Sequence, residues 1–332
     1  MSLAMKTFLV PTLASILVLI AIFVWGGWAA FTLAVLLTIL EVTLSFDNAV
    51  INARILQQMD EKWQRRFLTW GILVAVFGTR LVLPIIIVAA SVAMSPWAVA
   101  QLAAFNPEEY GHLLEGAHTA IAAFGGSFLL MVALKYFFDD AKSVHWIRTV
   151  ERHLARWGRI EAIEIGLALS LLGIISFFAG NAGTILSAGI IGIVLFIAMQ
   201  GIANSFSVEA ENAVAVGSAA LFLYLNVLDA AFSLDGVIGA FAITSSIPII
   251  VAGLGIGAYY VRSLTIYFVR QKTLDTLVFL EHGAHWAILG LAGAMLMSLF
   301  FHVPEVITGL VGLIFVGTAA YSSVQAIRKS AA

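Results

Sequence analysis

Residues 41–50 read EVTLSFDNAV, and residues 229–238 read DAAFSLDGVI. Both stretches place an acid, a serine and a second acid at the same offsets. These are Glu41, Ser45 and Asp47, followed by Asn48, in the first stretch, and Asp229, Ser233 and Asp235, followed by Gly236, in the second. Because chance is a poor explanation for such a match, the two stretches indicate an internal repeat.

The sequence around these acids is suited to a lipid bilayer. Of the 332 residues, 61% are hydrophobic and 11% are charged, and the mean hydropathy is +1.02, whereas about 25% of residues are charged in a soluble domain. A membrane span needs roughly 20 apolar residues. The fold class that we expect is therefore all-α, a polytopic membrane bundle of about ten transmembrane helices, near 7–25, 28–54, 67–92, 114–137, 162–180, 184–203, 213–242, 247–269, 283–301 and 305–326.

Further residues recur in the spans that follow each acidic stretch. A glycine stands nine residues before an arginine in both halves, and a Gly-Ala-His sequence with a nearby glutamate recurs one span later. Matching spans lie five apart in chain order and so point in opposite directions, which predicts two inverted-topology repeats, as in many secondary transporters. The recurring residues are Gly71 with Arg80 and Gly253 with Arg262, then Glu115 with His118 and Glu281 with His285.

Basic residues predict the orientation and the division of the chain. If the chain has ten spans and both termini are cytoplasmic, fifteen of the seventeen Lys and Arg residues fall on the cytoplasmic side. This orientation agrees with the known excess of Lys and Arg in cytoplasmic loops. The inner loop around Glu209 and Glu211 lacks them. We expect a first transmembrane repeat over 1–138, a basic interfacial linker helix on the cytoplasmic side over 139–161, and a fifth helix plus the second repeat over 162–332. The long first apolar run favours a retained helix over a signal peptide.

Composition excludes several classes of function. Because the chain has no cysteine, disulfides, thiolate metal sites and cysteine nucleophiles are ruled out. A formal charge of -2 gives no reason to expect a nucleic-acid partner. We expect lipid as the surrounding partner, no enzymatic activity and no permanent cofactor, and we leave open a homo-oligomer or stress-response partners.

The four acids at the centre of the repeats need compensation. One ionised acid inside a span costs about 2.5 to 3.5 kcal/mol on insertion scales, so four cost roughly 10 kcal/mol or more. Protonation, the arginines Arg80 and Arg262, or a bound cation can offset this cost. Pairing the two arginines with two acids as structural ion pairs still leaves two acids, which favours a functional cation site.

Helix geometry constrains how these acids can meet. At 100° per residue, Glu41, Ser45, Asn48 and Asn52 form one stripe, and Asp47 lies about 120° away from it. Either the helices break near residues 45–48 and 233–236, or the acids face different partners within the bundle. Broken helices are common at transporter ion sites because freed carbonyls become ligands.

The side chains in the repeats are hard ligands. Carboxylate, hydroxyl and amide oxygens suit Mg²⁺, Ca²⁺ or Mn²⁺, and His118 and His285 would favour manganese if they faced the same cavity; otherwise they are candidate gate residues or proton carriers. Arg80 and Arg262 are candidate gate or structural partners. The predicted metal ligands are Glu41, Ser45, Asp47, Asn48, Asp229, Ser233 and Asp235. A divalent cation is thus expected as the substrate.

A resemblance supports this interpretation. The residues Glu41 to Asn48, Thr69-Trp70-Gly71 with Arg80, Asp229 to Gly236, Arg262, and Leu280 to His285 resemble those of the TerC-like integral membrane proteins, in particular an uncharacterised bacterial branch. The resemblance covers nearly the whole chain. It implies a relation to tellurium-resistance membrane proteins and to bacterial manganese exporters of the inner membrane, with Glu41, Asp47, Asn48, Asp229 and Asp235 in the metal path. The chain differs from a shorter TerC core by added helices and by Gly236 in place of a second asparagine.

The favoured function is therefore transport of a divalent metal cation, most simply manganese export. The alternative is a non-transporting membrane scaffold of a metal or tellurite stress-response complex, with 139–161 as its docking surface. An intramembrane aspartyl protease would also need two acids, but it needs neither four acids nor two serines, and the usual Gly-x-Gly-Asp context is absent.

Overall fold

The computed structural model of the chain describes residues 3–205 and 213–330, so the loop around Glu209 and Glu211 lies outside the described residues. Within these ranges every regular element is a helix. The helices are α1 (Leu3–Leu44), α2 (Phe46–Leu56), α3 (Glu61–Leu73), the π-helix η1 (Val74–Val82), α4 (Leu83–Ser91), α5 (Pro96–Phe105), α6 (Pro107–Gly116), α7 (His118–Phe137), α8 (Arg148–Trp157), α9 (Ile163–Phe178), α10 (Ala182–Ser205), α11 (Ala213–Ile243), α12 (Ile247–Arg270), α13 (Thr273–Thr276), α14 (Leu280–Met297) and α15 (Glu305–Ser330).

Seven helical segments of the described chain are long and apolar enough to cross a membrane. Apolar side chains also stay exposed on the outside of the bundle, such as Val24 at 79% and Phe177 at 82%, as lipid contact requires. The expected all-α membrane protein is confirmed in this form. The number of ten spans stays a prediction, because α9 and α14 are not among the seven segments and α1 counts once although it folds into two arms.

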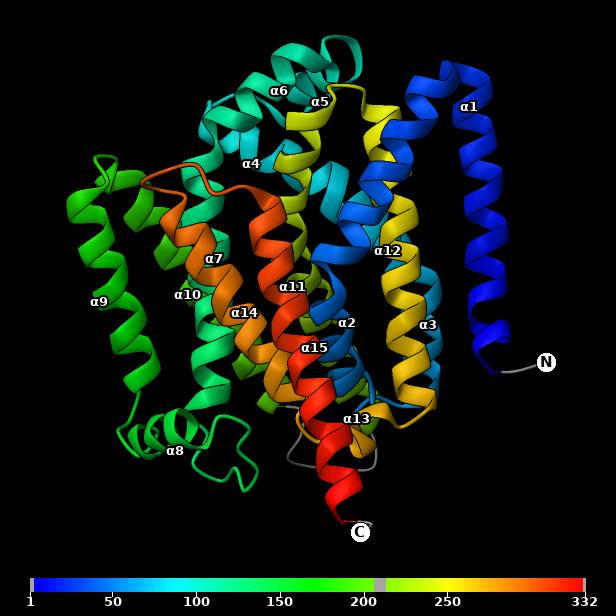
Figure 1. Ribbon diagram of the computed structural model, residues 1–332. Coiled ribbons are helices and arrows are strands. Elements are labelled where there is room, and N and C mark those ends of the chain that lie inside the picture. Colours follow the sequence, from blue (N-terminus) through cyan, green and yellow to red (C-terminus); the bar gives the residue numbers. More distant parts are fainter. Residues whose placement is uncertain (1–2, 206–212, 331–332) are drawn as a thin grey trace.

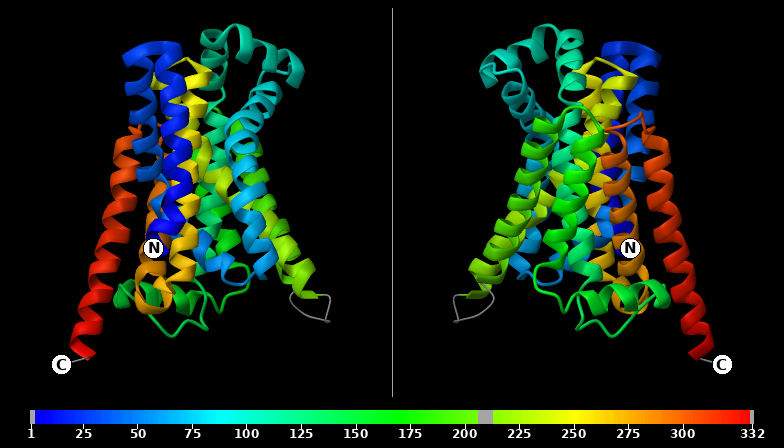
Figure 2. Two further views of the ribbon diagram at one scale, coloured as in Figure 1. Left: turned by 90° about the vertical axis from the view of Figure 1, so that its right-hand side faces the viewer. Right: turned by 90° about the vertical axis from the view of Figure 1, so that its left-hand side faces the viewer.

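The long helices run side by side, and short elements cover the two ends of the bundle (Figure 1). The helices α5 and α6 lie at one end, while α8 and the C terminus lie at the other, as both side views also show (Figure 2). We call these the α5/α6 end and the α8 end. The largest buried apolar cluster lies between them and draws on α2, α7, α10, α11 and α14.

The first helix is a hairpin. Gly27 has φ 67° and ψ -160°, a conformation that is essentially restricted to glycine. The chain therefore rises to the α5/α6 end and folds back toward the centre of the bundle (Figure 1). This turn falls between the expected spans 7–25 and 28–54.

The second arm of α1 ends at Leu44, and Ser45, with φ -103° and ψ 15°, separates it from α2. The break expected near residues 45–48 is thus present. The prediction of a second break near residues 233–236 is wrong, because α11 is one continuous helix from Ala213 to Ile243. Gly236 faces Glu41, and a Cβ there would lie 3.4 Å from Glu41 Oε2, an ordinary van der Waals contact.

Glycines also bring neighbouring helices together. On α10, a Cβ at Gly192 would lie 2.4 Å from the backbone oxygen of Phe124 on α7. A backbone atom cannot move aside as a flexible side chain can, so glycine is required where these two helices meet. On α9, by contrast, Gly173 has nothing within 4 Å of the position of a Cβ.

We expect Gly192→Ala to lower the free energy of unfolding by about 1–3 kcal/mol, the usual cost of overpacking. Gly173→Ala is the matched control and should be neutral or stabilising by up to about 1 kcal/mol, because alanine favours a helix over glycine. Thermal unfolding of the purified variants measures both. Equal stability of the two variants would show that α7 and α10 separate without cost.

Candidate functional site

Of the four acids in the two acidic stretches, Glu41 and Asp229 are buried and paired with the two buried arginines. Arg80 Nη2 donates to Glu41 Oε1, and Arg80 Nη1 donates to the carbonyl oxygen of Ala75 within η1. Arg262 Nη2 donates to Asp229 Oδ2 at 3.0 Å. None of the four charged side chains is more than 6% exposed. These pairs fit the interpretation of both arginines as structural partners of Glu41 and Asp229.

Contacts between the two acidic stretches follow the repeat. Asn48 Nδ2 donates to Asp229 Oδ1 at 2.8 Å, and Gly236, at the position equivalent to Asn48, lies beside Glu41, which is equivalent to Asp229. Ser45 Oγ donates to Glu41 Oε1 at 3.0 Å. The stretches are therefore in direct contact, as one common site requires.

The remaining two acids share a small cavity. Asp47 and Asp235 both line a space of about 10 Å³, together with Thr308 of α15 and the apolar side chains of Leu44, Phe232 and Leu291. That volume is about enough for one water molecule. Asp47 is 4% exposed, and its Oδ1 accepts the backbone amide of Asn48 at 2.9 Å. We call this space the acid cavity.

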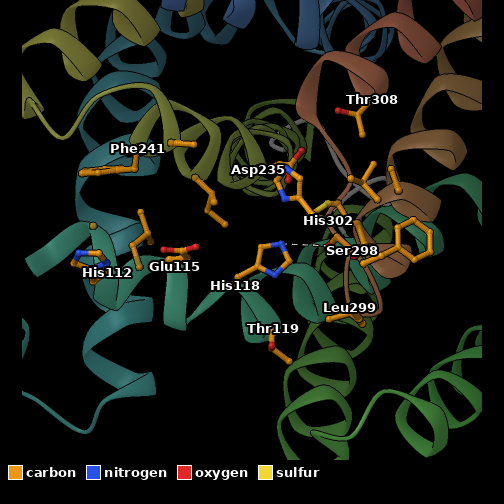
Figure 3. Close-up of a pocket in the computed structure, with 18 of the residues that line it drawn as sticks. His112, Glu115, His118, Thr119, Asp235, Phe241, Ser298, Leu299, His302 and Thr308 are labelled. Atoms are coloured by element: carbon orange, nitrogen blue, oxygen red, sulfur yellow. Dashed lines mark hydrogen bonds between the residues drawn. The ribbon is translucent and has the colours of Figure 1, made fainter. Parts of the chain in front are cut away.

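Asp235 also lines a much larger cavity at the α5/α6 end, which we call the α5/α6 vestibule (Figure 3). Its volume is about 630 Å³. Acidic and imidazole side chains gather on its wall, and His118 lies 3.3 Å from the hydroxyl of Ser298. These side chains are Glu108, His112, Glu115, His118, Asp235 and His302. The vestibule and the acid cavity therefore share two wall residues, Asp235 and Thr308.

A second large cavity of about 530 Å³ lies at the α8 end, and we call it the α8 vestibule. Two ion pairs line it, Arg54 with Glu281 and Lys135 with Glu164, each at 3.3 Å. His285 is also on its wall, stacked on the ring of Tyr136 with centroids 3.4 Å apart.

The two histidines therefore do not meet. His118 lines the α5/α6 vestibule and His285 lines the α8 vestibule, so neither the structure nor the repeat brings them to one ion. In the part of the chain that the structure describes, no three His, Asp or Glu side chains are grouped to hold a metal ion. A cation at this site would be completed by amide and hydroxyl oxygens or by water, as hard divalent cations accept.

Several buried polar atoms between the two vestibules have no hydrogen-bond partner. They are Asn48 Oδ1, Asn52 Oδ1 and Nδ2, Asn226 Oδ1 and Ser233 Oγ. An unsatisfied buried polar atom costs about 1–3 kcal/mol, so this group indicates that water or ions occupy the interior. Asn226 is absent from the predicted ligand set. The sequence could have indicated Asn226 as a site residue, because it is a polar residue three positions before Asp229 and so lies on nearly the same face of the helix.

A further buried acid fastens the linker to the bundle. Within the expected linker 139–161 only Arg148–Trp157 is helical, and Glu151 of this helix is 1% exposed. Its carboxylate accepts from His282 Nδ1 at 2.8 Å and from Trp286 Nε1 at 3.0 Å. Burial raises the pKa of Glu151, but the hydrogen bonds from His282 and Trp286 outweigh this effect and bring it to about 2.

A comparison with protein families matches residues 46–330 to the family described as a protein of unknown function, DUF475. The chain belongs to the DUF475 family. The match begins at α2, so Asp47, Asn48 and the whole of α11 lie inside it, while all of α1, including Glu41, lies outside. Among curated proteins and solved structures, none matches this DUF475 chain.

We expect Arg80→Ala to lower the free energy of unfolding by about 3–5 kcal/mol, because it leaves the buried carboxylate of Glu41 uncompensated. Replacing both members of the pair, in Glu41→Gln with Arg80→Met, should recover much of this loss. Arg65→Ala is the control: its pair with Glu61 is exposed, so its effect should stay within about 0.5 kcal/mol. Chemical unfolding of the purified proteins measures all three. An Arg80→Ala variant as stable as the control would contradict the structural role.

We expect Glu151→Gln to lower the free energy of unfolding at pH 7 by about 3 kcal/mol, from 1.36 kcal/mol per pKa unit. The pKa of Glu151 falls from 4.5 in the unfolded chain to about 2 in the folded protein. The ionised carboxylate therefore contributes its full stabilisation of the fold at pH values above 4.5. This stabilisation is lost as the pH falls through about 2. The difference between parent and variant should therefore shrink by more than half between pH 7 and pH 3. Glu161→Gln, an exposed acid of the same linker, should show a small difference at both pH values.

Proposed function

We propose that this DUF475 protein is a membrane transporter that moves a divalent metal cation between the α5/α6 vestibule and the α8 vestibule. The observation that carries the proposal is the acid cavity, lined jointly by Asp47 and Asp235. The favoured cation is Mn²⁺, in keeping with the resemblance to TerC-like proteins, and Ca²⁺ or Mg²⁺ suit the same oxygen ligands.

The balance of charge supports a divalent substrate. Arg80 and Arg262 each bond to one acid, Glu41 and Asp229. If all four acids are ionised, the four acids and the two arginines together carry a formal charge of -2. One divalent cation neutralises this charge, and it removes the penalty that two ionised acids would otherwise impose inside the membrane.

The distance between the vestibules also supports a transport path. Asp235 lines one vestibule and Tyr224 lines the other, and both belong to α11. Eleven residues separate them, which corresponds to about 16 Å along a helix. Buried polar side chains of α2 and α11, among them Asp47, Asn48 and Asp229, occupy this interval, so a cation would find oxygen ligands along it.

The proposal extends to the membrane arrangement. Ten spans, two inverted repeats, and both termini on the cytoplasmic side of the inner membrane account for the distribution of basic residues. The α8 end would then face the cytoplasm, because the linker with its arginines lies there (Figure 2).

We expect Asp47→Asn and Asp235→Asn each to abolish uptake of Mn²⁺ by proteoliposomes while the variants still insert and fold. Each substitution removes one of the charges that the cation neutralises. The parent should gain about 2.7 kcal/mol of stability at a Mn²⁺ concentration a hundredfold above its dissociation constant, and both variants should lose this gain. Thermal unfolding with and without Mn²⁺, run beside the uptake assay, measures both effects.

Glu61→Gln is the control, because Glu61 is exposed and paired only with Arg65. It should keep both uptake and stabilisation by Mn²⁺. The proposal fails if the parent takes up none of Mn²⁺, Ca²⁺ and Mg²⁺, or if Asp47→Asn and Asp235→Asn transport as the parent does. The acids would then be architectural.

A further inference from the structure

Three buried asparagines lie on the side of the acid cavity that faces the α8 vestibule. Asn48, Asn52 and Asn226 are 1%, 0% and 8% exposed. Asn48 and Asn52 are one helical turn apart on α2, and Asn226 is on α11. Apart from the bond of Asn48 to Asp229, no side-chain group from a facing helix satisfies them.

The hydrogen bonds of Asn48 and Asn226 determine which of their side-chain atoms have no partner. Asn48 Nδ2 donates to Asp229 Oδ1 at 2.8 Å, and Asn226 Nδ2 donates to the carbonyl oxygen of Phe222 at 2.7 Å. A carboxylate and a carbonyl only accept, so these two amides cannot be flipped. The unpartnered atoms of Asn48 and Asn226 are therefore their oxygens, which are ligands for hard cations.

The helix directions put these groups in one layer. The helices α2 and α11 run in opposite directions (Figure 1), and the bond between Asn48 and Asp229 fixes their register. One turn further toward the α8 end, Asn52 on α2 and Asn226 on α11 fall at the same level, within about 1.5 Å along the axis. The next side chains in that direction, Ile55 and Tyr224, line the α8 vestibule.

We propose that Asn48, Asn52 and Asn226 form a second, uncharged position for the transported cation, between the acid cavity and the α8 vestibule. This inference rests on the proposed transport function. Neutral amide oxygens hold a divalent cation more weakly than two carboxylates do, and conduction needs sites that a cation can leave. The cation occupies the acid cavity and the amide layer in turn, since two divalent charges in neighbouring positions would repel strongly.

The test uses the purified full-length protein, with Mn²⁺ uptake by proteoliposomes and thermal unfolding with and without Mn²⁺ as readouts. In Asn52→Leu, the apolar side chain replaces two unpartnered polar atoms, so the fold without metal should be at least as stable as the parent. Stabilisation by Mn²⁺ should be retained, because the acid cavity is intact. Uptake should fall by about tenfold or more, since the second position is lost. Asn226→Leu gives the same test on α11 if Asn52→Leu does not fold.

Thr265→Val is the control: this threonine is also fully buried, but its hydroxyl is already bonded to the carbonyl oxygen of Val261. Its uptake should match the parent. Uptake at the parent rate in both asparagine variants would show that the amides hold only water, and it would overturn this inference while the transport function stands. Loss of Mn²⁺ stabilisation together with uptake would also overturn it, because the asparagines would then belong to the acid cavity. A parent that moves no divalent cation defeats the proposed function itself.

A gain-of-charge variant provides an independent check. In the background Asp47→Asn with Asp235→Asn, where Mn²⁺ no longer stabilises the protein, adding Asn52→Asp should restore stabilisation by Mn²⁺, because it places a carboxylate in the amide layer. Thr265→Asp in the same background should not restore it. Failure of Asn52→Asp to restore stabilisation, in a protein that still folds, would contradict a cation position at this level.

Discussion

The salt bridges Glu41–Arg80 and Asp229–Arg262 hold two charges of each sign inside a bundle whose other buried side chains are mostly apolar. Each bridge joins two helices, α1 to η1 and α11 to α12. Breaking one would leave a buried charge without a partner, which costs far more than an exposed pair contributes. Two of the helices that line the acid cavity, α1 and α11, are therefore each fixed to a neighbouring helix by a buried bridge.

Glycines lie where a larger side chain would collide with the residues of these salt bridges. A Cβ at Gly71 would lie 2.6 Å from Arg262 Nη1, and a Cβ at Gly257 would lie 2.5 Å from the Glu41 side chain. The ring of Phe67 lies under the Arg262 guanidinium, with 4.3 Å between the carbon and the ring centroid, a stabilising arrangement for a desolvated cation. The glycine that precedes Arg262 by nine residues, Gly253, instead packs against Leu37. The repeated glycines thus share a spacing but differ in their contacts.

Much of this arrangement could be predicted from the sequence, because hydropathy and internal repetition are local signals. They gave the helical membrane fold, the four acids and the two arginines. The sequence could not tell which acids the arginines neutralise, since the partners lie 39 and 33 residues apart and meet only through the packing of the helices. The burial of Glu151 could not be predicted for a similar reason. In a basic amphipathic segment it resembles a solvent-facing acid, and its burial comes from His282 and Trp286, which are distant in sequence.

In a transport cycle of the proposed kind, the two sides of the acid cavity would play different parts. Asp235 lines the α5/α6 vestibule directly, whereas a cation bound for the α8 vestibule must pass Asn52, which is fully buried. In the described conformation the acid cavity therefore shares Asp235 and Thr308 with the wall of the α5/α6 vestibule and shares no lining residue with the α8 vestibule. Because α11 is continuous while α1 and α2 are separated at Ser45, the chain can most easily bend at Ser45. A small rotation of α2 about that point would turn Asn48 and Asn52 relative to Asp229 and open the other side, while Glu41 stays bonded to Arg80.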